Sequence, residues 1–468
     1  MKKIYTLGLS LLASAALMAQ EYYTTEVFTE VTETEGIVYG TGVLASGGTA
    51  NLELDIYMPN GDNRTDRPLI ITAHQGSFIP EYGDKNDQYL VDYATAMAKR
   101  GFVVATMNYR EGWGFSPLNT AEQNAREILP AAWRAIQDFK TAVRFFKKSI
   151  AEGGNIYGIS AERIIGSGFG AGAYLPINSQ IIDLSEELTI PELQQKNCFL
   201  GSCSPNGTPY IDSTDASLLG IYNTDGGHAG YSHRLGLVVN NSGAIPTIKL
   251  MDQGINPLVI STHAENDQAT PYKTDIVFAA GVFPIIEVAG SYSIHEKLRD
   301  LGENQFWLDE ARDGYTQPRV DGDTPEDNQY KQGLLTFADQ SYMWSVNGED
   351  TYSPEYQEAY TEYMDSVVVF NAFRIEKWLR TYTSITEKTV SVNDFNIYPN
   401  PASDVLNLRS FNTLANSIEL RDIAGKLVFS ETVNQKDQSF DIANLKPGIY
   451  LVKIETNQKT LTQKFVKR

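Results

Sequence analysis

The feature that most restricts the fold of this chain is the glycine at every second position of Gly168-Phe-Gly170-Ala-Gly172. The run Arg163-Ile-Ile-Gly just before it is short and apolar, as is typical of a buried strand. Glycine permits backbone conformations and close approaches that a side chain excludes. We therefore predict a buried strand that turns sharply into a helix at these glycines.

Short apolar runs alternate with longer helical stretches over most of the chain. Strands that are buried on both faces have this nearly continuous apolar character, and helical stretches such as residues 121–150 separate them. The alternation predicts an α/β fold, with a mostly parallel sheet flanked by helices. The apolar runs are Pro68–His74, Gly101–Asn108, Arg163–Gly166, Leu235–Asn240 and Pro257–His263.

Several segments resemble the carboxylesterase branch of the α/β-hydrolase superfamily. Leu54-Asp-Ile-Tyr-Met-Pro59 is similar to an early strand of that family, and Ala98–Arg110 to its next helix and strand. Asn240–Ile245 is similar to the strand end that follows the elbow helix. The resemblance implies an α/β-hydrolase-like domain over residues 20–380.

In that family the nucleophilic serine stands at the centre of a G-x-S-x-G elbow between a strand and a helix. Gly168 and Gly172 match the outer glycines, but Gly170 stands where the serine is expected. Glycine has no side chain that can attack an ester, so the resemblance implies an esterase scaffold without its nucleophile. Ser167 and Ser77 are candidate substitutes without an obvious base.

The other parts of an acyl-transfer site are partly present. His74-Gln75-Gly76-Ser77 resembles the H-G-G-G oxyanion loop, with Gln75 and Ser77 as departures. The donors of such a loop are backbone N–H groups, and the N–H of Ala171 is the second expected donor. His263-Ala-Glu-Asn-Asp267 resembles the motif that carries the triad acid, which implies this position for Asp267.

The triad histidine is the second departure. In the family it follows the next strand, here expected at Asn304–Leu308, and Tyr315 stands in the loop after that strand. A tyrosine with an ordinary pKa near ~10 is not a base at neutral pH. The alternative takes Phe283–Val288 as the last strand and keeps His295 as the base.

The residues around His295 predict a helix. Ser293 followed by Glu296 is the pattern of a capping box, which places His295 in the first turn. Downstream, an acidic and Tyr-rich insertion at about residues 316–360 is a candidate lid over the pocket mouth.

Two hypotheses from different classes follow. The first is a non-catalytic pseudo-esterase that keeps its pocket to bind an unidentified small molecule or glycan, with Trp113 as a candidate wall residue. The second is an active carboxylic-ester hydrolase with a displaced nucleophile that uses Asp267 and His295. We favour the first, because two triad members depart from the family pattern on the favoured alignment.

Charge and histidine content restrict the partners. The formal net charge of −20 disfavours nucleic acid and anionic membrane surfaces as partners. His228 and His233 have a four-residue spacing, but they lie in a Gly-rich loop without an evident third ligand. We expect no metal and no cofactor.

The start of the chain predicts export. Lys2 and Lys3 precede an apolar run and a small-residue end, so residues 1–19 have the form of a signal peptide. No later segment is long and apolar enough for a membrane span. Cys198 and Cys203 are the only cysteines, and in an oxidising compartment we expect them to form one local disulfide.

The end of the chain predicts a separate β-domain. A Thr/Ser-rich linker at residues 381–392 precedes short alternating segments with turns between them, a pattern typical of small β-folds. Residues 393–468 resemble the C-terminal sorting domain of the type IX secretion system, a small β-sandwich. This resemblance implies recognition by the type IX machinery and a protein that is secreted or attached to the outer cell surface. The motifs are Phe395–Pro401, Ser417–Lys426, Leu445–Lys453 and Lys464–Arg468.

Overall fold

A computed structural model describes most of the chain outside the N-terminal leader and several internal segments. The described residues are 22–114, 116, 118–182, 185–199, 202–212, 214–218, 228, 230–251, 256–307, 333–337, 354–383, 395–410, 415–422, 426–433, 435–456 and 460–468. The predicted signal peptide lies outside them. Among the described residues, no helix combines the length and apolar character that crossing a membrane requires.

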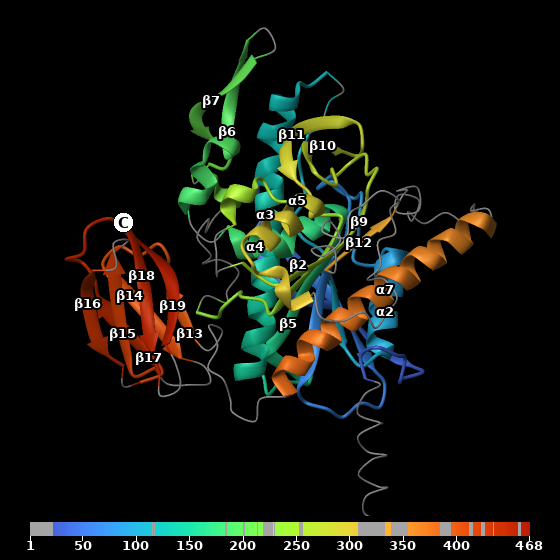
Figure 1. Cartoon of the computed structure of the whole chain (residues 1–468), viewed down its shortest axis with the longest axis horizontal. Helices are drawn as coiled ribbons and strands as arrows, with labels where there is room; N and C mark the ends of the chain where they lie inside the picture. Colours follow the sequence, from blue (N-terminus) through green and yellow to red (C-terminus); the bar gives the residue numbers. More distant parts are fainter. Residues whose placement is uncertain are drawn as a thin grey trace, which may run out of the picture.

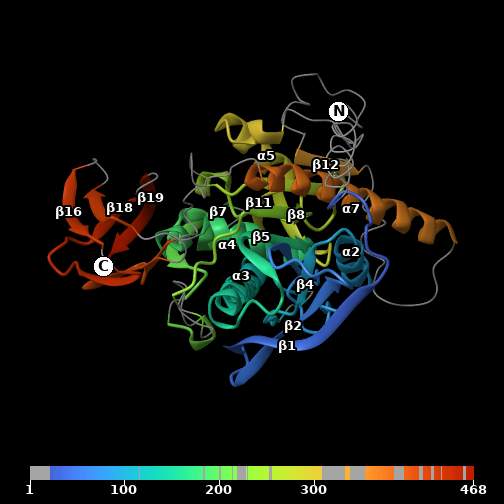
Figure 2. The same cartoon turned by 90° about the horizontal axis from the view of Figure 1, so that it is seen from below.

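The body of the protein is built on an eight-stranded sheet in the order β1-β2-β4-β3-β5-β8-β9-β12 (Figures 1 and 2). The first two strands pair in antiparallel fashion with their neighbours, and the other six run parallel. This confirms the mostly parallel sheet. The strands are β1 (Val31–Val43), β2 (Thr49–Pro59), β3 (Arg67–Ala73), β4 (Val103–Met107), β5 (Ile159–Phe169), β8 (Leu237–Asn241), β9 (Val259–Ala264) and β12 (Leu334–Phe337).

The central strands have two buried faces, because successive side chains of a strand point to opposite sides of the sheet. In β3, Leu69 and Ile71 join one hydrophobic cluster, whereas Ile70 joins the cluster on the other face. Helices cover both faces, which is why these strands read as continuous apolar runs. Helices α3 (Ala121–Glu152), α4 (Tyr174–Ile181) and α5 (Ser291–Asp300) pack on one side, and α2 (Gln88–Lys99) and α7 (Pro354–Thr383) on the other.

Helix α3 forms the long wall behind the later pocket. Thr120 caps its start, because the Thr120 hydroxyl accepts the Gln123 N–H while the Gln123 side chain accepts the Thr120 N–H. Within the helix, the Asp138 carboxylate forms a buried ion pair with Arg110, which follows β4 (2.7 Å). The helix is thereby attached to the edge of the sheet where the parallel strands end.

Two antiparallel hairpins stand outside the main sheet. Strands β6 (Gln194–Phe199) and β7 (Ser202–Pro209) form one hairpin, in which Cys198 and Cys203 face each other and are joined by a disulfide. Strands β10 (Thr274–Ala279) and β11 (Phe283–Ala289) form the other, which is bridged to the body between Ile245 and Ala289. Figure 1 places both beside α3 and α4.

The last strand of the sheet is neither of the two that we predicted. Asn304–Trp307 is a short 3-10 helix, and Phe283–Ala289 belongs to the separate β10–β11 hairpin. The position is taken by β12, Leu334–Phe337, which pairs in parallel with β9. Only four residues form this strand, Leu334-Leu-Thr-Phe337, and they lie inside the acidic segment interpreted as a candidate lid. A run this short gives little strand signal although it is apolar.

The C-terminal residues form two facing antiparallel sheets around one apolar core, which includes Phe395, Phe440 and Phe465. This is the small β-sandwich that the sequence predicted. Helix α7 continues to Thr383, so the first three residues of the predicted linker are helical. The strands are β13 (Phe395–Tyr398), β14 (Val405–Ser410) and β17 (Asp437–Asp441) in one sheet, and β15 (Ser417–Asp422), β16 (Leu427–Thr432), β18 (Gly448–Glu455) and β19 (Thr460–Lys467) in the other.

Candidate functional site

The turn between β5 and α4 has the geometry of a nucleophile elbow. Strand β5 ends at Phe169, a 3-10 turn spans Gly170–Ala173, and α4 begins at Tyr174. Gly170 has a φ of +50°, in the left-handed region that side chains disfavour. Such strain at the end of a central strand is what exposes the central residue of an elbow.

The three glycines of this turn differ in the space that a side chain would have. A Cβ at Gly168 would lie 2.2 Å from the carbonyl oxygen of Gly172, and one at Gly172 would lie 2.3 Å from that of Ala73. These backbone approaches exclude any side chain. A Cβ at Gly170 would meet nothing closer than the Cβ of Gln75, at 3.1 Å. Gly170 is therefore the position at which packing comes closest to tolerating a side chain, and no side chain is there.

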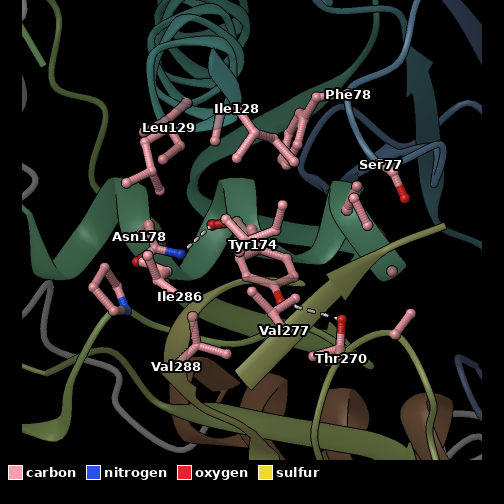
Figure 3. Close-up of a pocket in the computed structure, with 18 of the residues that line it drawn as sticks. Ser77, Phe78, Ile128, Leu129, Tyr174, Asn178, Thr270, Val277, Ile286 and Val288 are labelled. Carbon is pink, nitrogen blue, oxygen red and sulfur yellow. Dashed lines mark hydrogen bonds between the residues drawn. The ribbon is translucent and has the colours of Figure 1, made fainter. Parts of the chain in front are cut away.

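The elbow forms the floor of a cavity of about 120 Å³. Its lining is mainly apolar and comes from α3, α4, the β10–β11 hairpin and the loop after β3. Figure 3 shows Tyr174 in the centre, with Ile128 and Leu129 on one side and Val277 and Ile286 on the other. A concave, mainly apolar pocket with few polar groups is the usual form of a small-molecule site.

The loop after β3 forms the polar end of the cavity. Gln75, Gly76 and Ser77 all line it, together with Gly170 and Ala171. The N–H of Ala171 lies in the first turn of its helix and has no partner within that helix, so it is a candidate donor to a ligand. The loop is held in place because the Ser77 hydroxyl accepts the N–H of Ala280, at the tip of the β10–β11 hairpin (3.0 Å).

His74 has a structural position beneath this loop. Its ring stacks on Tyr109 at 4.3 Å, and its Nδ1 donates to the carbonyl oxygen of Gln75 at 2.6 Å. Burial lowers the pKa of His74 to about 4, so the ring is neutral at physiological pH. This hydrogen bond fixes the backbone just before Gly76.

Asp267 lies at the C-terminal end of β9 and lines the cavity. Its Oδ1 accepts the N–H groups of Ala269 (2.8 Å) and Thr270 (2.9 Å), and its Oδ2 lies 3.5 Å from Nε2 of His263. The Nε2 of His263 is 3.0 Å from the carbonyl oxygen of Thr270. The carboxylate thus organises its own loop, and the imidazole beside it is a scaffold histidine.

Two family matches agree with this geometry. Residues 54–188 match the family described as BD-FAE, and residues 396–468 match the family described as secretion system C-terminal sorting domain. The body of the chain is an esterase-like α/β-hydrolase domain. The sorting domain behind it marks the chain for secretion and attachment at the cell surface by the type IX system. A search of curated proteins found no match.

Solved structures similar to the chain are mostly esterases. A bifunctional GH43-CE protein of Bacteroides eggerthii is 15% identical with a TM-score of 0.37; the match covers 72% of this chain and 35% of that protein, about a third of its length. A truncated carbohydrate esterase from gut microbiota is 14% identical (TM-score 0.33), and the match covers 59% of this chain and 86% of that one. Thermogutta terrifontis esterase 2 is 14% identical (TM-score 0.34), and the match covers 72% of this chain and 95% of that one. These low TM-scores add nothing to the assignment, which rests on the family matches and the sheet.

His295 does not occupy the pocket of this hydrolase domain. Helix α5 begins at Ser291 after Gly290, so the predicted capping box is wrong and His295 lies beyond the first turn. The side chain of His295 is fully buried, and its Nε2 is 3.0 Å from the Ser261 hydroxyl of β9. Burial lowers the pKa of His295 to about 3. A ring with this pKa in a buried polar cluster is poorly suited to act as a general base at neutral pH.

Tyr315 lies outside the described residues. Its assignment to the triad histidine position depends on a strand at Asn304–Leu308, and Asn304–Trp307 form a 3-10 helix instead. The histidine position of the family follows the last strand, which here is β12, ending at Phe337. All five histidines of the chain precede residue 296, so none follows β12 in the sequence.

Trp113 is also not a pocket wall. Its indole N–H donates to the carbonyl oxygen of Ser77 at 2.8 Å, so it supports the loop from outside the cavity. The tryptophan that lines the cavity is Trp133 of α3. Trp133 lies in the helical stretch predicted at residues 121–150, and helical periodicity alone does not separate a core position from a cavity wall.

The remaining histidines have structural partners. Nε2 of His228 lies 2.8 Å from the carbonyl oxygen of Tyr39, and a ring nitrogen of His233 lies 3.4 Å from Arg144. Burial, reinforced by the neighbouring cations Lys140 and Arg144, holds the pKa of His233 well below its usual range. Within the described ranges, no three His, Cys, Asp or Glu residues are placed to hold a metal ion.

One carboxyl group in the segment after β4, that of Glu111, has a strongly shifted pKa. Burial raises the pKa of Glu111 to about 8, and the nearby carboxylates of Asp84 and Asp87 add to this, while a hydrogen bond from the Glu81 N–H opposes it. In the folded state this group therefore keeps its proton far above the ordinary value of 4.5. Between these two values the folded state binds more protons than the unfolded state, so stability falls as the pH rises.

We predict that Glu111→Gln removes this decline. The stability of the variant relative to the original protein should rise between pH 5 and pH 8 by roughly 1–3 kcal/mol, and little difference should develop below pH 4. Urea unfolding at a series of pH values measures it, with Glu127→Gln on the exposed face of α3 as the control. An unchanged difference across this range would show that Glu111 is ionised in the folded protein.

Proposed function

We propose that this protein is a secreted, surface-associated, non-catalytic hydrolase-fold protein that binds an apolar small molecule in the esterase pocket. The observation that carries the proposal is Gly170 at the centre of a well-formed elbow, because the turn is retained and the attacking atom is absent. The sorting domain supports the extracellular location. The mainly apolar lining of the cavity supports an apolar ligand.

The rest of the triad supports the same proposal. Asp267 is present but occupied by its own loop, and the imidazole beside it, His263, is engaged with Thr270. No histidine of the chain follows β12. A serine in the elbow would therefore lack the base that must take its proton.

The second candidate, an active ester hydrolase with a displaced nucleophile, finds less support. Ser77 is the hydroxyl that lines the cavity beside the oxyanion loop, but it accepts the Ala280 N–H and lies near no described histidine ring that faces the cavity. Ser167 is fully buried in β5 and does not line the cavity. His295 is not among the residues that line the cavity.

Two measurements on the full mature chain test the proposal. Short-chain p-nitrophenyl esters should not be turned over above background, either by the original protein or by Gly170→Ser, since the serine would have no base. Asp267→Ala serves as the control for contaminating esterases. Turnover by the original protein that disappears in Asp267→Ala would contradict a non-catalytic role.

Binding is tested with hexanamide as a small apolar probe, by isothermal titration calorimetry. Ala132→Leu fills space at the cavity wall on α3 and should weaken binding at least about tenfold, because the added methyl groups occupy the ligand volume. Ala151→Leu makes the same change on an exposed position of the same helix and should leave affinity unchanged. Equal affinities for the two variants would place the ligand elsewhere.

A further inference from the structure

The side chain of Gln75 is the most unusual polar group of the cavity. Its backbone is fixed on both sides, because its N–H donates to the Tyr89 hydroxyl (2.8 Å) and its carbonyl oxygen accepts from His74 (2.6 Å). Its carboxamide, by contrast, has no hydrogen-bond partner among the described residues and lines the cavity. It is half-buried, and neither of its polar atoms is sealed away from the cavity.

The carboxamide stands beside the vacant nucleophile position. The Oε1 of Gln75 lies 3.6 Å from where a Cβ at Gly170 would be, and its Cβ lies 3.1 Å away. In the family motif this position of the oxyanion loop is a glycine, so a side chain has been gained next to the place where one has been lost. A carboxamide supplies two N–H donors and a carbonyl acceptor, which suits recognition and not attack.

The surroundings restrict the ligand group that would pair with Gln75. A carboxylate ligand only accepts hydrogen bonds, and it would face the Asp267 carboxylate that lines the same cavity. An ammonium group only donates, so it would use the Oε1 acceptor of Gln75 and leave its two N–H donors without a partner. A neutral amide uses both functions of Gln75, since its carbonyl accepts from Nε2 and its N–H donates to Oε1.

The volume restricts the rest of the ligand. The cavity of about 120 Å³ is slightly smaller than the ~150 Å³ engineered cavity that takes up benzene. Its walls along α3 and the β10–β11 hairpin are mainly aliphatic, with residues such as Ile136 and Ile286 beside the aromatic Trp133. The enclosed part therefore suits a hydrocarbon body of about six carbon atoms.

We propose that Gln75 is the residue that selects the ligand, by pairing its carboxamide with a neutral amide group attached to a short hydrocarbon body. This inference rests on the proposed function, because it assigns the polar end of the same pocket. It gives Gln75 the place of a specificity-determining residue where the family resemblance implied only a backbone donor.

The test compares hexanamide with N,N-dimethylhexanamide, which lacks the N–H groups, by calorimetry on the full mature chain. Hexanamide should bind about five- to tenfold more tightly, the effect of one additional neutral hydrogen bond. Gln75→Met keeps the length of the side chain but has no amide. It removes both hydrogen bonds, so it should lower the hexanamide affinity by about 25- to 100-fold and abolish the preference between the two probes. Gln88→Met, at an exposed position of α2, is the matched control and should retain the preference.

Each outcome separates this inference from the proposed function. A preference that persists in Gln75→Met, or no preference in the original protein, overturns the role of Gln75. If both probes still bind and Ala132→Leu weakens the binding of both, the pocket binds the ligand without a selective role for Gln75. If neither probe binds, the amide ligand class is wrong. Ester turnover that depends on Asp267 would instead overturn the non-catalytic function itself.

Discussion

Replacing Gly172 with alanine should destabilise the hydrolase domain by about 3 kcal/mol or more, whereas Gly170→Ala should cost only about 1 kcal/mol. The new Cβ at Gly172 would lie 2.3 Å from the carbonyl oxygen of Ala73 and 2.4 Å from that of His74, and backbone atoms cannot move aside as a side chain can. At Gly170 the main cost is a positive φ, with one contact to the Gln75 Cβ at 3.1 Å.

Tryptophan fluorescence during urea unfolding measures both variants selectively. All five tryptophans, of which Trp378 is the last, precede the sorting domain, so the signal reports the hydrolase domain alone. Similar losses for Gly170→Ala and Gly172→Ala would mean that the elbow does not have the close backbone contacts described above. A stable Gly170→Ala variant would also show that the nucleophile position tolerates a side chain without any change in chemistry.

The second large effect concerns the ion pair between Arg110 and Asp138. Asp138 accepts the Arg110 N–H at 2.7 Å and its guanidinium at 2.7 Å, and both residues are buried. We expect Asp138→Ala to cost about 3–5 kcal/mol, because it leaves a buried guanidinium without its counter-charge.

A matched control lies on the same helix. Arg126 and Glu122 form an ion pair one turn apart, and the Arg126 side chain is 45% exposed. Arg126→Ala should therefore change stability by about 0.5 kcal/mol or less, since solvent screens such pairs. The same fluorescence experiment compares them, and a loss below about 1 kcal/mol for Asp138→Ala would show that the guanidinium finds other partners, such as the Val43 and Ser217 carbonyl groups.

Much of the central sheet could be predicted from the sequence. Strands such as β3 and β9 are buried on both faces and therefore consist of continuous apolar residues, which is a strong local signal. The elbow was also predictable, because only glycine fits at Gly168 and Gly172 and their spacing follows from the turn itself.

The last strand of the sheet and the burial of His295 could not be predicted in the same way. Strand β12 is four residues long and gains its identity by pairing with β9, some seventy residues earlier in the chain, so no local pattern defines it. The predicted start of the helix that carries His295 is three residues late, because the N-cap is Gly290, which has no side chain to form a cap, and not Ser293. Burial of the ring depends on Ser261, a residue of another element.

The cavity itself was the hardest feature to predict. Its walls come from stretches that are far apart in the chain, between Gln75 and Val288, and the β10–β11 hairpin supplies a large share of them although only one of its strands was expected. Which tryptophan faces the cavity, Trp113 or Trp133, is decided by tertiary packing and not by the residues near it in sequence.

The β10–β11 hairpin has one further consequence, for how this pocket can change over time. The two strands of the hairpin pair with each other and are not strands of the eight-stranded sheet. The hairpin is held to the body by the Ile245–Ala289 bridge, by the Ser77–Ala280 hydrogen bond and by packing against α3. Substitutions at Val277 or Ile286 can thus reshape the cavity while the sheet remains intact. Under the proposed function, related proteins can therefore change the ligand that they bind by substitutions in this one hairpin, without changing the sheet.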